Sequence, residues 1–287
     1  MKTLYTSNGA RQVHLGAIER QTQDPRDAAF RLHVPKGVLT PLPPSVDNRS
    51  KCSPIQDQGT LGSCTAHSIA GAVESNEKRT QRNLPWWMRI FGVSPVTPLI
   101  RISRLFQYYA SRLLDNTTAL DMGSTLRNSI KAAANFGVVA ETLWPYVEDK
   151  FATNPPSSAW KEARSHRVTS YHAIKDGDLA TMKAALAAKN LICFGFTVYD
   201  AMLSSDMSKT GLLCSPLPGE QVQGGHAVCL VGYDDNKVMP DGSKGAFLVR
   251  NSWGTGWGLS GYFWMAYNYV GDKDLSWDFW VITSAPI

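Results

Sequence analysis

The chain changes character near residue 165, where helical periodicity gives way to short β-type runs. Apolar residues recur at helical spacing in TAHSIAGAVESNEKRT, ISRLFQYYASRLL and TLRNSIKAAANFG, and Gly137 is placed to end the last of these helices. The later runs are rich in β-branched and aromatic residues and are separated by Gly, Asp and Asn: LICFGFTVY, HAVCLVGYDD, GAFLVRNSW and GYFWMAY. This order predicts an α+β fold whose helical and antiparallel β parts meet at a cleft.

An irregular lead-in of about 45 residues precedes the first long helix. Asp24-Pro25 predicts a short helix that continues to Leu32, because proline suits the first helical turn. Four prolines then favour extended chain: Pro35, Pro41, Pro43 and Pro44. We expect this lead-in to have no core of its own.

Composition argues against two classes of partner. The net charge of +5 comes from Lys and Arg scattered along the chain, so neither a nucleic-acid polymer nor an anionic membrane surface is expected to bind. No run approaches the roughly 18–20 apolar residues of a membrane span. The start, MKTLYTSNGARQVHLG, lacks the apolar core of a secretory signal, so the expected location is the cytoplasm, or outside the cell by a route without a classical signal.

The five cysteines do not form a recognisable framework. Their odd number, their irregular spacing and the absence of a CxxC pair predict neither a disulfide scaffold nor a zinc site, and no cofactor or metal is expected. Cys193 and Cys229 lie inside apolar runs, which favours inert core thiols. The disulfide status of Cys52 and Cys214 stays open.

Cys64 stands at the start of a predicted helix. Free N–H groups and the positive end of the helix dipole would favour its thiolate and lower its pKa. Gly59 and Gly62 allow a tight turn and the close approach of a ligand. The alternative is a buried structural cysteine that happens to precede a helix.

Two further residues complete a possible catalytic set. His226 follows Gly224-Gly225 and opens a strand, where a histidine is more often structural than catalytic. Asn251 lies in RNSWGTGWG, which on its own reads as a glycine-rich turn between strands. Each site is weak alone, but together with Cys64 they supply a nucleophile, a base and an orienting amide.

Three blocks carry a family resemblance. QGTLGSC before a helix, GGHAVCLVGY and NSWGTGWGLSGY resemble the active-site blocks of the papain-like cysteine peptidases, in the same order, from about Ser45 onward. The segment Asp24-Pro25-Arg26-Asp27 and the block QGTLGSCTA are most similar to compact bacterial members. The resemblance implies a two-lobed fold with a helical left lobe, an antiparallel β-barrel-like right lobe and the cleft between them. It places a lead-in at 1–45 and a peptidase domain at 46–287, mainly helical over about 46–150 and mainly β over about 151–287.

The resemblance also assigns roles to residues. Cys64 is similar to the nucleophile, His226 to its base and acid, and Asn251 to the residue that orients the imidazole. Gln58 is similar to the side-chain donor of the oxyanion hole, and Trp253 to the indole that covers the Asn–His hydrogen bond. These roles imply an endopeptidase that attacks a peptide or protein substrate with a thiolate–imidazolium pair and passes through a thioester.

Substrate contacts are implied by position as well. Gly123 and Ser124 resemble the residues that hydrogen-bond the substrate backbone. The pocket for the second residue before the scissile bond, expected to prefer hydrophobic or aromatic side chains, would be lined by Thr125, Leu126, Gly195, Gly225 and Ala227. The insert at 84–99 is expected to pack on its own domain, and residues 1–40 are expected to occlude the active site in part.

Three residues depart from the family pattern. Leu61 stands where many relatives have a disulfide cysteine, Thr65 replaces an aromatic residue, and His67 is interpreted as a packed histidine. Such a chain would fold without disulfides, as expected for a bacterial or otherwise reducing origin. Two alternatives stay open: a catalytically silent binding protein of this fold, and a Cys–His acyltransferase or amidase.

Overall fold

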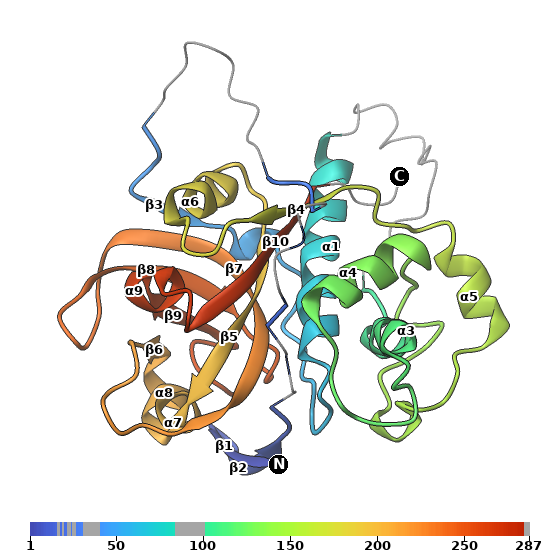
Figure 1. Cartoon of the computed structure of the whole chain (residues 1–287), viewed down its shortest axis with the longest axis horizontal. Coiled ribbons are helices and arrows are strands. Elements are labelled where there is room, and N and C mark those ends of the chain that lie inside the picture. The colour runs from blue at the N-terminus through green and yellow to red at the C-terminus, as the bar shows by residue number, and fades with distance from the viewer. Residues whose placement is uncertain are drawn as a thin grey trace.

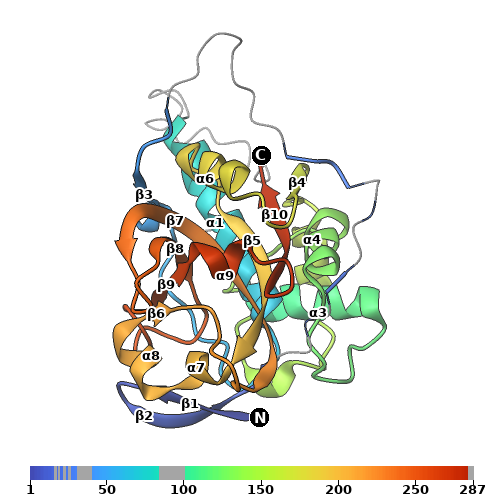
Figure 2. The same cartoon turned by 60° about the vertical axis from the view of Figure 1, so that its left-hand side comes forward.

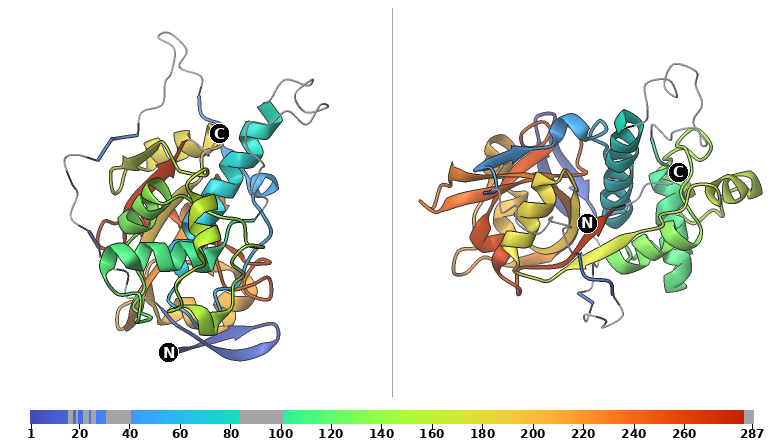
Figure 3. Two further views of the ribbon diagram at one scale, coloured as in Figure 1. Left: turned by 90° about the vertical axis from the view of Figure 1, so that its right-hand side faces the viewer. Right: turned by 90° about the horizontal axis from the view of Figure 1, so that it is seen from above.

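The computed structural model describes residues 1–15, 18, 20–21, 24, 27–30, 41–83 and 101–283, with only the backbone of 77–83. A helical part and a sheet part lie on either side of the long helix α1 (Cys64–Asn83), as Figures 1 and 3 show. Residues 31–40 and the insert at 84–99 lie outside the described residues. Among the described residues, none of the helices combines the length and the apolar character that crossing a bilayer needs.

Two helices of the helical part begin at polar side chains that cap them. Beside α1 this part contains α3 (Arg104–Asp115), α4 (Leu126–Asn135) and α5 (Ser157–Ala163). The Ser103 and Thr125 side chains cap α3 and α4 by accepting hydrogen bonds from the backbone N–H three residues on. Because α5 packs with α3 and α4 in one apolar cluster, the helical part continues past the division expected near residue 150.

The sheet part is almost entirely antiparallel, as predicted. Within the described ranges eight strands pair in the order β4-β10-β5-β7-β8-β9-β6, with β3 added on β7, and only β6 runs parallel to its neighbour β9. Their bounds are β3 (Ser45–Asp47), β4 (Tyr171–Ile174), β5 (Ile192–Tyr199), β6 (Leu212–Leu213), β7 (Val222–Val238), β8 (Lys244–Arg250), β9 (Tyr262–Ala266) and β10 (Ser276–Ile282). The short helices are α6 (Leu179–Ala187), α7 (Asp200–Leu203), α8 (Ser205–Thr210), α9 (Tyr267–Gly271), η1 (Arg49–Lys51) and η2 (Glu148–Lys150).

The lead-in contains regular structure that the sequence reading did not predict. Strands β1 (Lys2–Thr6) and β2 (Gly9–Val13) form a hairpin that turns at Ser7-Asn8 and packs beneath α7 and α8 (Figure 2). Leu4 and Val13 have no exposed surface and belong to the core of the sheet part. The hairpin is therefore built into the domain.

The helix predicted from Asp24-Pro25 to Leu32 is wrong for the residues that the structure describes. Ala29 forms a parallel bridge with Ala173 of β4, the Phe30 N–H donates to the Ala173 carbonyl at 2.8 Å, and the Ala173 N–H donates to Ala28. The free edge of β4 offers hydrogen bonds that keep this stretch extended.

We predict that the hairpin contributes to the stability of the whole domain. Leu4→Ala should lower the free energy of unfolding by about 2–5 kcal/mol, because it empties a filled core position. The measurement is urea unfolding of the full chain. Tyr5→Ala on the same strand is the matched control, because Tyr5 is 45% exposed, and it should change stability by less than about 0.5 kcal/mol. Equal stability of the Leu4 variant and the unsubstituted chain would contradict a core role.

Candidate active site

Cys64 is the first residue of α1 and lies against strand β7. Its thiol is within hydrogen-bonding reach of the backbone of Ala227, which directly follows His226, and of Thr65. The loop before it turns at Gly59, whose φ of +61° is in the left-handed region that favours glycine. The fold therefore brings the thiol at the helix start beside the histidine strand.

The state of the Cys64 thiol differs from the expectation. The sequence predicts a lowered pKa, but burial raises the pKa of Cys64 to about 11, although its backbone hydrogen bonds oppose this. Only 1% of Cys64 is exposed. Loss of water stabilisation outweighs the helix N-terminus here, so the covered thiol is protonated at neutral pH.

His226 is fixed through one of its ring nitrogens. Its Nε2 lies 2.8 Å from Oδ1 of Asn251, and this oxygen also accepts from the Ser252 N–H at 2.8 Å. An oxygen acceptor requires the proton to be on Nε2, which leaves Nδ1 as the basic nitrogen. Among the described residues Nδ1 has no hydrogen-bond partner. Burial lowers the pKa of His226 to about 4, with the Asn251 hydrogen bond acting in the opposite direction.

Trp253 covers the face of the histidine. The two rings stack with centroids 4.7 Å apart and an interplanar angle of 22°. Trp257 in turn packs edge-on against Trp253 at 5.0 Å. The indoles keep the His226–Asn251 hydrogen bond out of water and hold the ring in one orientation.

Gln58 is positioned by both parts of the molecule. Its Oε1 accepts from the Ser252 hydroxyl at 2.7 Å, and its Nε2 donates to the Leu61 carbonyl at 2.9 Å. The Tyr146 hydroxyl donates to the Gln58 carbonyl at 2.8 Å and lies 2.6 Å from the Ser63 hydroxyl. Tyr146 thus fixes both ends of the loop before Cys64, a contact that the sequence did not reveal.

The lead-in lies directly over these groups. The His14 carbonyl accepts a second hydrogen bond from Gln58 Nε2, at 3.3 Å. Leu15 packs on Gly224 and Ile18 on Gly225, where an added Cβ would lie 3.1 and 2.8 Å from them. His14, Leu15 and Ile18 of the lead-in therefore contact Gln58, Gly224 and Gly225.

The predicted substrate-binding residues fall into three groups. Leu126, Gly225 and Ala227 lie close to Ile18 or in its apolar cluster. Gly195 faces the Trp277 indole, where an added Cβ would lie 2.9 Å from Nε1. The remaining three make structural contacts: the Gly123 N–H donates to the Tyr108 hydroxyl at 3.1 Å, Ser124 donates to Asp115 at 2.6 Å, and Thr125 caps α4.

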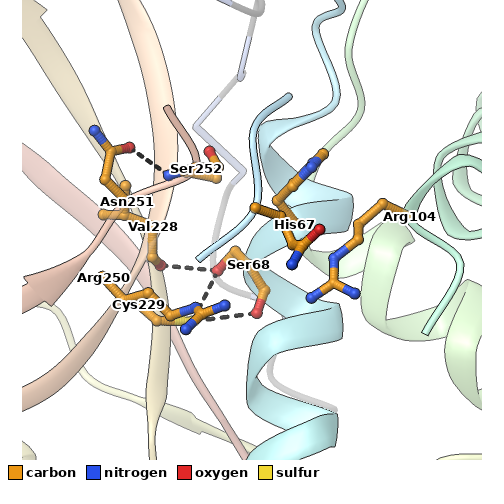
Figure 4. A pocket seen from close by; sticks show the side chains of 10 residues that line it. His67, Ser68, Arg104, Val228, Cys229, Arg250, Asn251 and Ser252 are labelled. Carbon is orange, nitrogen blue, oxygen red and sulfur yellow. Dashed lines mark hydrogen bonds between the residues drawn. The ribbon is translucent and has the colours of Figure 1, made fainter. Parts of the chain in front are cut away.

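A small chamber lies between α1 and strands β7 and β8 (Figure 4). At about 10 Å³ it has room for roughly one water molecule. His67 lines it as a packed histidine, as predicted: burial lowers its pKa to about 3, and Nδ1 lies 3.1 Å from the Ser63 carbonyl. The other lining residues are Gln56, Ser68, Arg104, Ala227, Val228, Cys229, Arg250, Asn251 and Ser252.

Three of the other four thiols are buried in the same apolar cluster as Cys64. Cys193 and Cys229 are buried core thiols, as predicted, and their sulfur atoms lie 3.5 Å apart on neighbouring strands. Cys52 is also buried and Cys214 is partly exposed. In the described ranges, no three His, Cys, Asp or Glu side chains are arranged to hold a metal ion.

Comparison with known proteins matches this geometry to one family. A family model described as papain family cysteine protease matches residues 93–276, a range that includes His226 and Asn251 and begins after Cys64. The chain is 40% identical to an uncharacterized peptidase C1-like protein of Acanthamoeba polyphaga mimivirus, over 79% of this chain and 68% of the viral one. It is 28% identical to bovine pro-cathepsin H over 78% of this chain, but spans only 59% of that relative.

Solved structures resemble the whole chain. Xylellain, a cysteine protease from Xylella fastidiosa, is 30% identical with a TM-score of 0.77, and the match covers 99% of this chain and 98% of xylellain. A procathepsin B from Trypanosoma congolense, 19% identical with a TM-score of 0.66, covers 94% of this chain and 87% of its own and shares the fold.

We predict that the covered Cys64 reacts slowly with iodoacetamide. Because its pKa is about 11, the alkylation rate of the full chain should keep rising from about pH 6 to about pH 9 without a plateau. Peptide mass spectrometry separates this site from Cys214, and a Cys64→Ala chain gives the background. A plateau below about pH 8 would contradict a thiol held neutral by burial.

Proposed function

Because the chain belongs to the papain family of cysteine proteases, we propose that Cys64, His226 and Asn251 hydrolyse internal bonds of a peptide or protein substrate. One observation carries the proposal. Asn251 Oδ1 lies 2.8 Å from His226 Nε2, which leaves His226 Nδ1 without a partner among the described residues. His226 belongs to the strand whose next residue, Ala227, contacts the Cys64 thiol. The peptidase domain in this proposal comprises residues 46–287, preceded by a lead-in at 1–45.

Acylation uses the free nitrogen of the histidine. His226 Nδ1 takes the thiol proton as Cys64 attacks the carbonyl carbon of the substrate. The oxyanion accepts hydrogen bonds from Gln58 Nε2 and the Cys64 backbone N–H, and one such donor is typically worth about 10²–10³ in rate. When the C–N bond breaks, Nδ1 returns the proton to the leaving amine and a thioester remains.

Deacylation runs through the same groups. With the amine gone, Nδ1 accepts a proton from a water molecule as that water attacks the thioester carbonyl. The C–S bond then breaks, the acid leaves, and the proton returns to the Cys64 sulfur. Asn251 and Trp253 act by holding the imidazole, so that Nδ1 faces the reacting atoms in both steps.

The lead-in keeps this machinery closed in the proposed resting state. The His14 carbonyl uses the Gln58 donor that the oxyanion requires, while Leu15 and Ile18 cover the Gly224-Gly225 wall. Burial raises the pKa of Cys64 and lowers that of His226, so the covered pair is neutral and not an ion pair. Substrate binding therefore requires the lead-in to move.

We predict that Ile18→Asp in the full chain raises kcat/KM on peptide substrates roughly tenfold or more. A carboxylate without a partner against Gly225 costs several kcal/mol in the covered state, so the lead-in leaves the site. Fluorogenic peptide hydrolysis is the measurement. Leu42→Asp, also in the lead-in but already 41% exposed, is the control and should behave as the unsubstituted chain. Equal rates for all three chains would argue against autoinhibition.

The assignment of the nucleophile is tested in the same background. Cys64→Ala added to Ile18→Asp should abolish hydrolysis of a fluorogenic peptide library while leaving the urea unfolding midpoint nearly unchanged. Unchanged turnover would refute the assignment. Loss of all hydrolysis even with Cys64 present would favour a silent binding protein, and transfer to added amines in place of water would favour an acyltransferase.

A further inference from the structure

A chain of hydrogen bonds runs from the start of α1 to the backbone of Gln58. His67 lies near the beginning of this helix (Figure 4), and its Nδ1 is 3.3 Å from the Ser63 hydroxyl and 3.1 Å from the Ser63 carbonyl. The same hydroxyl lies 2.6 Å from that of Tyr146, which donates to the Gln58 carbonyl at 2.8 Å. Three side chains thus connect the helix to the residue whose Nε2 is the proposed oxyanion donor.

The last acceptor of this chain fixes where each proton lies. The Gln58 carbonyl can only accept, so the Tyr146 hydroxyl donates to it and must itself accept from Ser63. With its proton used in this way, the Ser63 hydroxyl can only accept from His67 Nδ1, and so can the Ser63 carbonyl. The imidazole proton is therefore on Nδ1. All links donate in the same direction, which strengthens each of them.

The surroundings of His67 keep it in this form. Only 6% of His67 is exposed, and burial lowers its pKa to about 3, so the ring is neutral and carries one proton. The ring also packs edge-on against that of Tyr146, with centroids 5.1 Å apart and an interplanar angle of 80°. The packing and the single proton together hold the Tyr146 hydroxyl on the Gln58 carbonyl.

Gln58 is held from both parts of the molecule. In the sheet part, the Ser252 carbonyl accepts from the Gln58 N–H at 2.9 Å, and the Ser252 hydroxyl donates to Oε1. The Gln58 carbonyl accepts from Tyr146 and, at 3.3 Å, from the Leu61 N–H of the same turn. Within the described residues, Tyr146 is thus the hydrogen-bond link between Gln58 and the helical part.

We propose that His67 is a positioning residue of the oxyanion hole, acting through Ser63 and Tyr146. The inference rests on the proposed function, in which Gln58 Nε2 and the Cys64 N–H stabilise the oxyanion. Ser63 directly precedes Cys64, so Tyr146 ties together the two ends of the segment that carries both donors. Without the His67 N–H, the two hydroxyls lose the partner that orients them, and the distance between the donors is less tightly fixed.

The test replaces His67 with residues that keep either its ring or its donor. In the full chain carrying Ile18→Asp, His67→Phe keeps an aromatic ring beside Tyr146 and removes the N–H. We expect kcat on a fluorogenic peptide to fall roughly 3- to 10-fold, with KM within about twofold. His67→Asn restores a donor near the position of Nδ1 and should recover most of the rate. His166→Phe, the same replacement at a buried histidine that contacts Glu162, is the matched control and should leave kcat unchanged.

Two probes of Cys64 separate positioning from a general disturbance of α1. A peptide aldehyde forms a tetrahedral adduct with the thiol, and the oxygen of this adduct occupies the oxyanion hole. Its affinity for the His67→Phe chain should therefore fall by about the same factor as kcat. Iodoacetamide reacts at a saturated carbon and develops no oxyanion, so its rate with Cys64 should stay within about twofold.

A second substitution tests the route through Tyr146. Tyr146→Phe should lower kcat roughly tenfold, because it removes the link to the Gln58 carbonyl. Adding His67→Phe to it should change kcat little further, because the chain is already broken. A full second loss in the double variant would contradict a role of His67 through Tyr146.

Each outcome separates the two proposals. Unchanged kcat and aldehyde affinity in His67→Phe overturn the positioning role while the proposed function stands. A parallel fall in the alkylation rate does the same, because it shows that α1 itself is disturbed. If His67→Phe does not fold, Ser63→Ala breaks the same chain at a small side chain and is judged by the same measurements. Absence of hydrolysis in the Ile18→Asp chain with His67 intact overturns the proposed function, and the positioning role with it.

Discussion

The contact between the start of α1 and the middle of β7 is the constraint on which the site depends. One turn after Cys64, the Ser68 hydroxyl donates to the Val228 carbonyl at 2.8 Å, and the Cys229 thiol donates to the Ser68 carbonyl at 3.1 Å. Both elements are buried along this line, so neither can slide without breaking hydrogen bonds that water cannot replace. Cys64 and His226 belong to these two different elements, and this interface holds the Cys64 thiol beside the strand that carries His226.

The same burial that holds Cys64 and His226 in place disfavours the charged form of each. A helix N-terminus and a neighbouring histidine favour a thiolate in water, but the covered site has no water to stabilise either ion. The tightest packing therefore gives the least reactive state. In the proposed mechanism, uncovering the site returns water to Cys64 and His226 and so favours their charged forms, which makes reactivity depend on what lies over the site.

The sequence singled out the proposed catalytic groups because each is a residue type with the required chemistry in a defined local setting. Cys64, His226 and Asn251 all lie within three residues of a glycine, and such settings are visible in the local sequence. The side chains of Asp121 and His14, which lie 2.8 Å apart, carry no such signal, because the two residues are 107 positions apart and only the fold brings them together. The hydroxyl of Tyr146 was missed for the same reason: its partners Gln58 and Ser63 are more than 80 residues away.

The elements that follow from local sequence periodicity were predictable, and those that depend on hydrogen bonding between distant segments were not. The three predicted helices follow from the helical spacing of apolar residues and the four strand runs from their β-branched and aromatic residues, and together they predicted the α+β class. The helix expected after Asp24 fails because the edge of β4 supplies backbone partners to Ala28 and Phe30, and no local propensity reports a distant strand edge. The hairpin at residues 2–13 was not predicted, because within its two strands only Leu4 and Val13 are buried, which is too few apolar positions to show a strand period.

The position of that hairpin explains how weak contacts can keep the cleft covered. The described residues His14, Leu15 and Ile18 offer one 3.3 Å hydrogen bond, one His–Asp pair and two apolar side chains. In a free peptide, such contacts would hardly offset the translational entropy lost on binding. Leu4 and Val13 are fixed in the core immediately before these residues, so folding has already removed most of their translational freedom. Binding of the lead-in is then intramolecular at a high effective concentration. A cut after residue 18 would leave both the hairpin and the covering residues in place, so release of the cleft depends on the contacts of His14, Leu15 and Ile18 themselves.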